Sequence, residues 1–326
     1  RGRCGETARQ FAFFDTQCSI YNPNNISEGS YVYATLPLFI INLAGQGAAA
    51  INLGGLQTPA HWLTYDYIHL VGRFISAIVD VLTILVLYLI GKRLFTRNHG
   101  VLAAGLYAFA ALPIQLSHYW TVDIQSHLYA AMAIYGAIEI GSRGRFWGYA
   151  LYGLALAAAL ASRINLYPLV GLLPLALIVR YWLGWFQHRE AGVRALYPPT
   201  VRRQLNEDGL AALVSIALAL LAFRIFQPYA FVGPGINNWT FDPEWLEELI
   251  YVSDLSRIPS DGWPPSVQWF GRMPFVYPWI QMVIWGMGVG LGIAATAALI
   301  GAIIVQLRRR KPDFALALLA VWVLAY

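Results

Sequence analysis

Residues 68–92 read IHLVGRFISAIVDVLTILVLYLIGK. Between the ends of this run the only charged side chains are Arg73 and Asp80. Roughly 20 apolar residues are enough for a helix to cross the hydrocarbon core of a bilayer. A helix also satisfies all its backbone hydrogen bonds internally, as lipid requires. The run therefore predicts a transmembrane helix.

Similar runs recur along the chain and predict an all-α bundle of about eight spans. They lie at 68–92, 99–117, 121–141, 146–162, 166–186, 209–226, 278–306 and 313 onward. The apolar run 31–54 is different, because Pro37, Gly45 and Gly47 interrupt it. These breaks favour an interfacial helix that lies on or dips into the membrane. If this run crossed the membrane instead, residues 1–30 would lie in the cytoplasm rather than outside.

Composition agrees with a membrane protein. Hydrophobic residues form 58% of the chain and charged residues 12%, whereas soluble domains carry about 25% charged residues. The Lys and Arg residues are dispersed in short loops, so the net charge of +5 does not indicate nucleic-acid binding.

The positions of the positive charges predict orientation. Basic clusters follow every second span, at 92–97, 143–145, 189–203 and 308–311. Because positively charged loops stay in the cytoplasm, the alternate loops face outward. The acidic, Trp-rich loop 227–277 is the largest of these outer loops.

These assignments describe one transmembrane domain over residues 1–326. It consists of an outer loop 1–67 with the interfacial helix 31–54, helices in 68–226, the outer loop 227–277 and C-terminal helices in 278–326. The chain begins in polar sequence and stops inside an apolar run, which indicates a piece of a longer protein.

Three arginines at outer helix ends oppose the charge rule: Arg73, Arg163 and Arg224. Guanidinium groups bind phosphate oxygens through paired hydrogen bonds. Their common depth predicts a phosphate or diphosphate site. The alternative is that each side chain extends to lipid headgroups or pairs with a carboxylate.

The stretch SHYWTVDIQSHL contributes further polar candidates. Asp123 and His127 lie four residues apart on one helix face, and His118 precedes them. They could bind a divalent metal ion, position a hydroxyl group, or form a structural hydrogen bond. Asp80 is expected to make a buried hydrogen bond between helices. Cys4 and Cys18 could pair in an oxidising compartment or remain free thiols.

A family resemblance emerges from the order of several motifs. They are GR-x-x-SA at 72–77, GKRLF at 91–95, QLSHYWTVD at 115–123, ASRIN at 161–165, QPYAF at 227–231 and the stretch 264–288. Together they resemble the membrane-embedded glycosyltransferases of the C superfamily. The closest likeness is to the family-39 group, which includes protein O-mannosyltransferases and bacterial aminoarabinose-type transferases.

The resemblance implies transfer of a sugar from a polyprenyl-phosphate carrier to an acceptor at the outer face of a bacterial cytoplasmic membrane. It implies Asp123 as the catalytic acid of the pocket and Arg163 as a cation near the carrier phosphate. It also places Gln227 and Tyr229 at the mouth. The chain departs from the family in its first outer loop, where Asp15 and Glu28 are isolated and no Asp-Glu pair occurs.

Two rival hypotheses remain. The missing acidic pair and the glycine-rich span 278–306 fit a non-catalytic subunit that packs against other membrane proteins. A transporter is less consistent with the sequence, which shows no inverted repeat or matched pair of broken helices.

Overall fold

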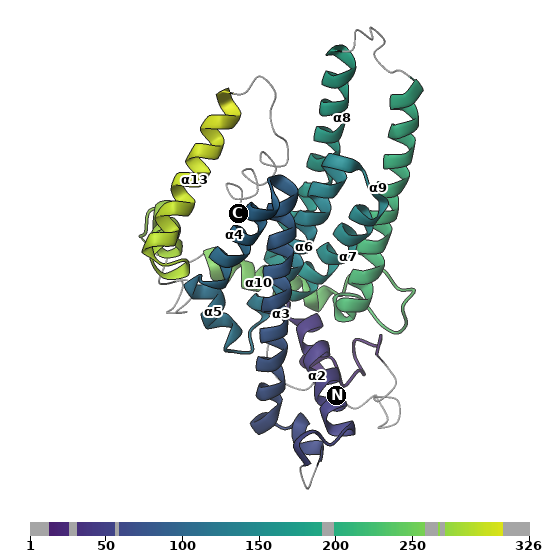
Figure 1. The fold of residues 1–326 in the computed structure, drawn as a ribbon. Coiled ribbons are helices and arrows are strands. Elements are labelled where there is room, and N and C mark those ends of the chain that lie inside the picture. Colours follow the sequence, from purple (N-terminus) through teal and green to yellow (C-terminus); the bar gives the residue numbers. More distant parts are fainter. Residues whose placement is uncertain are drawn as a thin grey trace.

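The computed structural model describes residues 13–25, 31–55, 59–190, 199–257, 267 and 271–308, and these ranges form a helical bundle (Figure 1). The helices are α2 (Thr35–Ala50), α3 (Tyr65–Leu94), α4 (Arg97–Ala108), α5 (Ala111–Ser117), α6 (Val122–Arg143), α7 (Phe146–Ser162), α8 (Leu172–Glu190), α9 (Pro199–Phe226), α10 (Pro243–Arg257), α12 (Val276–Gln281) and α13 (Val289–Arg308). Short helical turns are η1 (Pro23–Asn25), η2 (Leu53–Gly55), η3 (Pro59–Leu63), η4 (Ile164–Gly171), η5 (Pro228–Ala230) and the π-helical η6 (Met282–Gly286).

The all-helical class is confirmed, but the predicted eight spans are not. Among the described residues, three helices are long and apolar enough to cross a membrane: Tyr65–Leu94, Ile164–Tyr181 and Leu205–Phe226. A fourth span results if the bent pair α4 and α5 counts as one. The helices Phe146–Ser162 and Val289–Val305 are apolar but shorter. The run predicted from 313 onward lies outside the described residues.

Two predicted spans are broken. The run 99–117 bends by 63° between α4 and α5, because Pro113 has no N–H to donate to the carbonyl of Phe109. The run 278–306 is interrupted after η6, where Gly288 adopts a φ of 84°. Hydropathy alone did not reveal either break, since both segments remain apolar throughout.

Glycines allow the central helices to approach closely. A Cβ on Gly136 of α6 would lie 2.9 Å from the Gly148 carbonyl of α7. A Cβ on Gly153 of α7 would lie 2.4 Å from the Ser215 carbonyl of α9. Such contacts between small residues hold helices together in lipid, where no hydrophobic force drives association. Helices α6, α7 and α9 thus form the centre of the bundle.

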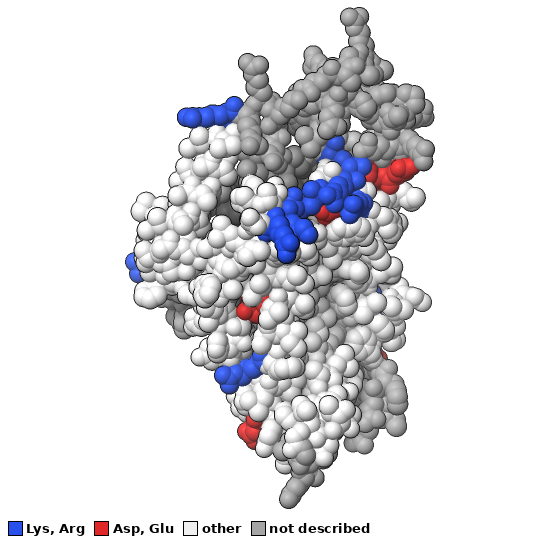
Figure 2. Space-filling view, in the orientation of Figure 1, with Lys and Arg blue, Asp and Glu red and all other residues white. Residues whose placement is uncertain are grey.

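The two ends of the bundle carry different charges. We call one the cationic end: it contains Lys92, Arg93, Arg97, Arg143 and Arg145, where α3 and α6 end and α4 and α7 begin. Figure 2 shows a band of Lys and Arg side chains crossing this part of the surface. Helices α7, α8 and α9 are also joined at this end, because Asp208 of α9 accepts hydrogen bonds from Tyr149 of α7 and Arg180 of α8.

The Asp123 end is formed by the opposite helix termini: the starts of α3 and α6 and the ends of α7 and α9. Helices α3 to α9 therefore alternate in direction, as the loop charges predict. Two further segments cover this end and pack on each other through Thr16–Phe231 and Asn24–Glu248 hydrogen bonds. We call residues 13–25 and 227–257 together the outer cap.

Candidate active site

An ion pair between α6 and α7 is the central feature of the Asp123 end. Thr121 is extended and α6 starts at Val122, so Asp123 lies in the first turn, where the helix dipole favours a negative charge. Helix α7 ends at Ser162, and Arg163 extends from its terminus. Arg163 Nη1 donates to Asp123 Oδ1. The side chains are 29% (Asp123) and 39% (Arg163) exposed, so a bound molecule could reach both.

The segment that leads into α2 contacts the ends of both α7 and α9, next to this pair. The backbone N–H of Ala34, just before α2, donates to the carbonyl of Ser162 at 3.0 Å. Gln227 Nε2 donates to the Val32 carbonyl at 3.2 Å. Gln125, two residues after Asp123, is 0% exposed, and neither of its amide atoms has a hydrogen-bond partner among the described residues. The site therefore has a polar interior beside its exposed ion pair.

Arg73 and His118 are brought together next to the segment that leads into α6. Arg73 Nε donates to the His118 carbonyl at 2.7 Å, and both side chains are exposed. The His118 ring instead contacts the Ile114 carbonyl through Nδ1. A Cβ on Gly72 would lie 2.7 Å from the ring of Trp120. The start of α3 therefore packs against residues 118–121, immediately before Asp123.

His127 lies one turn deeper on α6 and interacts electrostatically with Asp80 of α3. Asp80 Oδ1 accepts a hydrogen bond from Tyr107 OH of α4 at 3.0 Å. This contact confirms the predicted bond between helices at Asp80. Within the described residues no group of three or more His, Cys, Asp or Glu side chains is arranged to hold a metal ion. Asp123, His118 and His127 therefore do not converge as ligands.

Arg224 has a different environment from the one expected for a phosphate ligand. It is 0% exposed, and its guanidinium donates to the carbonyls of Pro228, Gly235 and Asn238. The rings of Phe14 and Phe231 lie over it, at 5.1 and 4.9 Å from the guanidinium carbon. A cation at a helix C-terminus can satisfy backbone carbonyls in this way. Arg224 therefore does not join Arg73 and Arg163 in one phosphate site, contrary to the prediction.

Gln227 and Tyr229 are likewise buried rather than lining a mouth. The Tyr229 hydroxyl is 2.8 Å from Ser19 Oγ, and burial raises the pKa of Tyr229 to about 12. Cys18, in the same segment, is disulfide-bonded. Cys4, the only other cysteine of the chain, lies outside the described residues. The contact between Tyr229 and Ser19 joins the two segments of the outer cap.

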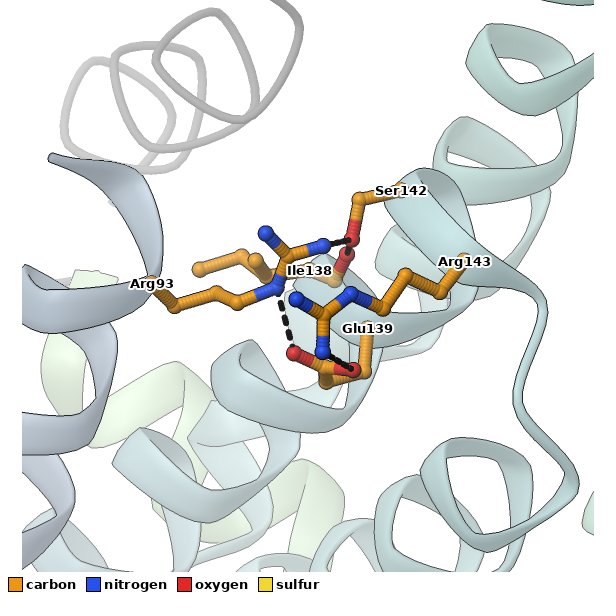
Figure 3. A network of polar contacts seen from close by, with 5 residues as sticks. All are labelled: Arg93, Ile138, Glu139, Ser142 and Arg143. Atoms are coloured by element: carbon orange, nitrogen blue, oxygen red, sulfur yellow. Dashed lines mark hydrogen bonds and ion pairs between the residues drawn. The ribbon is translucent and has the colours of Figure 1, made fainter.

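An acidic centre at the cationic end was not predicted from the sequence (Figure 3). Glu139 of α6 is 1% exposed and accepts a hydrogen bond from Arg93 Nε at 2.5 Å. Its other oxygen has an ion-pair contact with Arg143 Nη1 at 4.0 Å. Arg93 also donates to Ser142, which donates to the Ile138 carbonyl. An acid inside an apolar helix, four residues before an arginine, was the available signal.

The fold and site thus define a polytopic helical membrane protein with an accessible Asp–Arg pair at one end. Residues 66–198 match the model of the dolichyl-phosphate-mannose-protein mannosyltransferase family, which confirms the predicted resemblance. The match runs from the start of α3 past the end of α8 and includes Arg73, Asp123 and Arg163. It supports a membrane glycosyltransferase that uses a polyprenyl-phosphate sugar. No curated protein and no solved structure matches the chain.

Proposed function

We propose that this protein is an integral-membrane glycosyltransferase that moves a sugar from a polyprenyl-phosphate carrier to an acceptor at the outer face of the membrane. The observation that carries the proposal is the Asp123–Arg163 pair. It is accessible, lies at a helix-terminal end of the bundle and falls within the family match. The paired Glu139 at the opposite end is buried and cannot be reached in the same way.

Two observations support the outward orientation of the site. The basic residues between α3 and α4 and between α6 and α7 lie at the opposite end, and such loops stay in the cytoplasm. Cys18 of the outer cap is disulfide-bonded, and disulfides persist in oxidising compartments outside the cytoplasm. These observations support our proposal that the Asp123 end lies on the periplasmic side of a bacterial cytoplasmic membrane.

In the proposed reaction, Asp123 accepts the proton of the acceptor hydroxyl. The hydroxyl oxygen then forms a bond to the anomeric carbon, and the bond from that carbon to the carrier phosphate breaks. Negative charge develops on the departing polyprenyl phosphate, where the guanidinium groups of Arg163 and Arg73 stabilise it. Arg224 is left out of this site because its donors are already bound to backbone carbonyls.

Asp15 has a structural role in the outer cap, which argues against its use as the base. Its Oδ1 accepts the backbone N–H groups of Gln17 and Cys18, at 3.1 Å each, and so holds a turn in the outer cap. Of the described acids at this end, Asp123 is the one that forms an ion pair with an arginine. The structural role of Asp15 also supports a second candidate function, a transferase-like subunit without activity, because this acid of the N-terminal segment then takes no part in catalysis. Other membrane subunits would be its partners.

The test uses the full-length protein in lipid nanodiscs with a panel of radiolabelled polyprenyl-phosphate hexoses and pentoses. Release of polyprenyl phosphate is measured, because this product forms whichever acceptor is used. We expect turnover with at least one donor, and a loss of about 10²–10⁴-fold in Asp123→Asn. The matched control Asp15→Asn keeps the turn's acceptor oxygen and should retain activity. Turnover by Asp123→Asn equal to that of the control would contradict the proposal, and no turnover with any donor would favour the non-catalytic subunit.

A further inference from the structure

Three arginines of the cationic end gather around Tyr135 of α6. The Tyr135 side chain interacts electrostatically with the carboxylate of Glu139 and with three guanidinium groups, those of Arg93, Arg143 and Arg145. These arginines come from the end of α3, the end of α6 and the turn before α7. We call the three of them the arginine cluster. Because its three cations share one carboxylate, the cluster has an excess of positive charge.

The turn between α6 and α7 explains why two members of the cluster lie together. Gly144 follows α6 with a φ of 59°, and its N–H donates to the carbonyls of Glu139 and Ile140 at 3.1 and 2.9 Å. Glycine adopts this left-handed conformation without steric cost, and it commonly ends a helix in this way. The chain then turns directly into α7, so Arg143 and Arg145 flank a single residue.

Several donors of the cluster are left for another group. Arg93 uses Nε for Glu139 and Nη2 for Ser142, each at 2.5 Å. Arg143 reaches Glu139 only at 4.0 Å, and its side chain is 45% exposed. Arg145 is exposed and forms no ion pair within the described residues. Figure 3 shows the guanidinium groups of Arg93 and Arg143 side by side over the Glu139 carboxylate. The buried acid therefore holds these cations in place and leaves their remaining N–H groups for an anion.

Aromatic side chains beside the cluster indicate the depth of this site. The ring of Trp147 lies 5.7 Å from that of Tyr135. Trp147 is 40% exposed and Phe146, the first residue of α7, is 60% exposed. Exposed aromatic residues of this kind collect at the boundary between membrane and water, at the level of the lipid headgroups. A lipid headgroup therefore fits the cluster better than a phosphate ion free in the cytoplasm.

We propose that the arginine cluster binds the phosphate headgroup of an anionic phospholipid, such as phosphatidylglycerol. Guanidinium groups bind phosphate oxygens through paired, charge-assisted hydrogen bonds. Basic pockets between the cytoplasmic ends of transmembrane helices suit such headgroups. Glu139 is then a positioning residue, because it orients Arg93 and Arg143 and does not touch the lipid. The site lies at the opposite end of the bundle from the Asp123–Arg163 pair, so this inference does not depend on the proposed function.

The test measures lipid binding to the full-length protein in detergent by native mass spectrometry. Phosphatidylglycerol is compared with phosphatidylcholine of the same acyl chains, and inorganic phosphate is added as a competitor. Arg145→Gln removes one cation of the cluster without breaking an ion pair. The matched control is Arg308→Gln, because Arg308 is also an exposed arginine and lies in the last turn of α13, on the same predicted side of the membrane.

We expect the unaltered protein to prefer phosphatidylglycerol to phosphatidylcholine by about tenfold or more, and Arg145→Gln to weaken phosphatidylglycerol binding about tenfold. Adding Arg143→Gln should weaken it further, and Arg308→Gln should leave it unchanged. Equal weakening by Arg145→Gln and Arg308→Gln would overturn the inference, since a diffuse positive field would then explain the binding. Equal binding of the two lipids would also overturn it. Displacement of phosphatidylglycerol by an equal concentration of inorganic phosphate would overturn the assignment to a lipid.

Discussion

The two ends of the bundle each contain an acid of α6 paired with an arginine from a neighbouring helix, yet the pairs differ in accessibility. At the cationic end, Glu139 is 1% exposed and Arg93 22%. At the Asp123 end, the partners are 29% and 39% exposed. A buried carboxylate must keep its partner, because removing either one leaves an uncompensated charge. An accessible pair can exchange partners, so it is the one suited to bind and release a substrate.

The largest stability difference should come from changing the acid of each pair. Glu139→Gln should lower the free energy of unfolding by about 3 kcal/mol, because Arg93 and Arg143 lose a buried counter-charge. Asp123→Asn should lower it by less than about 1 kcal/mol, since solvent screens this pair. Unfolding in nanodiscs or mild detergent, followed by tryptophan fluorescence, measures both. Equal destabilisation by the two substitutions would remove the distinction between the ends.

The next largest effect should be at Arg224, which belongs to the Asp123 end but is buried like Glu139. Arg224→Gln removes charge-assisted hydrogen bonds to backbone carbonyls and should cost about 2 kcal/mol. Hydrogen exchange in residues 13–25 and 227–242 should accelerate, because Arg224 joins the last turn of α9 to the outer cap. Arg73→Gln is the matched control and should leave exchange in these segments unchanged. Unaltered protection in Arg224→Gln would show that the cap does not depend on this side chain.

A smaller effect is expected at the α7–α9 contact, away from both ion pairs. Gly153→Ala places a Cβ 2.4 Å from the Ser215 carbonyl and should cost about 1 kcal/mol by forcing the helices apart. Gly209→Ala on α9 is the control, since its Cβ meets nothing within 4 Å. Thermal unfolding of the two variants checks the prediction. A Gly153→Ala protein as stable as the control would mean that α7 and α9 separate without cost.

The smallest effect concerns pH and the outer cap. Burial raises the pKa of Glu248 above its ordinary value of 4.5, although the hydrogen bond from Asn24 opposes the shift. The folded cap therefore favours the protonated acid. Its contribution is complete below the ordinary pKa and is lost as pH rises through the raised pKa. In Glu248→Gln, the protection of the cap's backbone amides against hydrogen exchange should fall less between acidic and neutral pH than in the unaltered protein. An unchanged pH profile would exclude Glu248 as the titrating group.

Much of the candidate site was predictable because it depends on helix ends. Asp123 was placed in the first turn of a helix and Arg163 at the end of the next, and antiparallel neighbours bring such termini together. The partners of Arg224 could not be predicted in the same way. They are carbonyls of a loop and rings from residues 14 and 231, so they depend on how the outer cap folds back over α9. The same applies to Glu139, whose main partner lies 46 residues away.

The sequence by itself determined that this is a helical membrane protein, which helices alternate in direction and where the charged helix ends lie. These properties depend on local hydropathy and loop charge, because each segment enters the membrane according to its own residues and flanking charges. The tertiary structure alone decided which charges pair and which arginine is enclosed. Those outcomes depend on helix rotation, on glycine contacts and on a break at Pro113, which involve residues far apart in the chain.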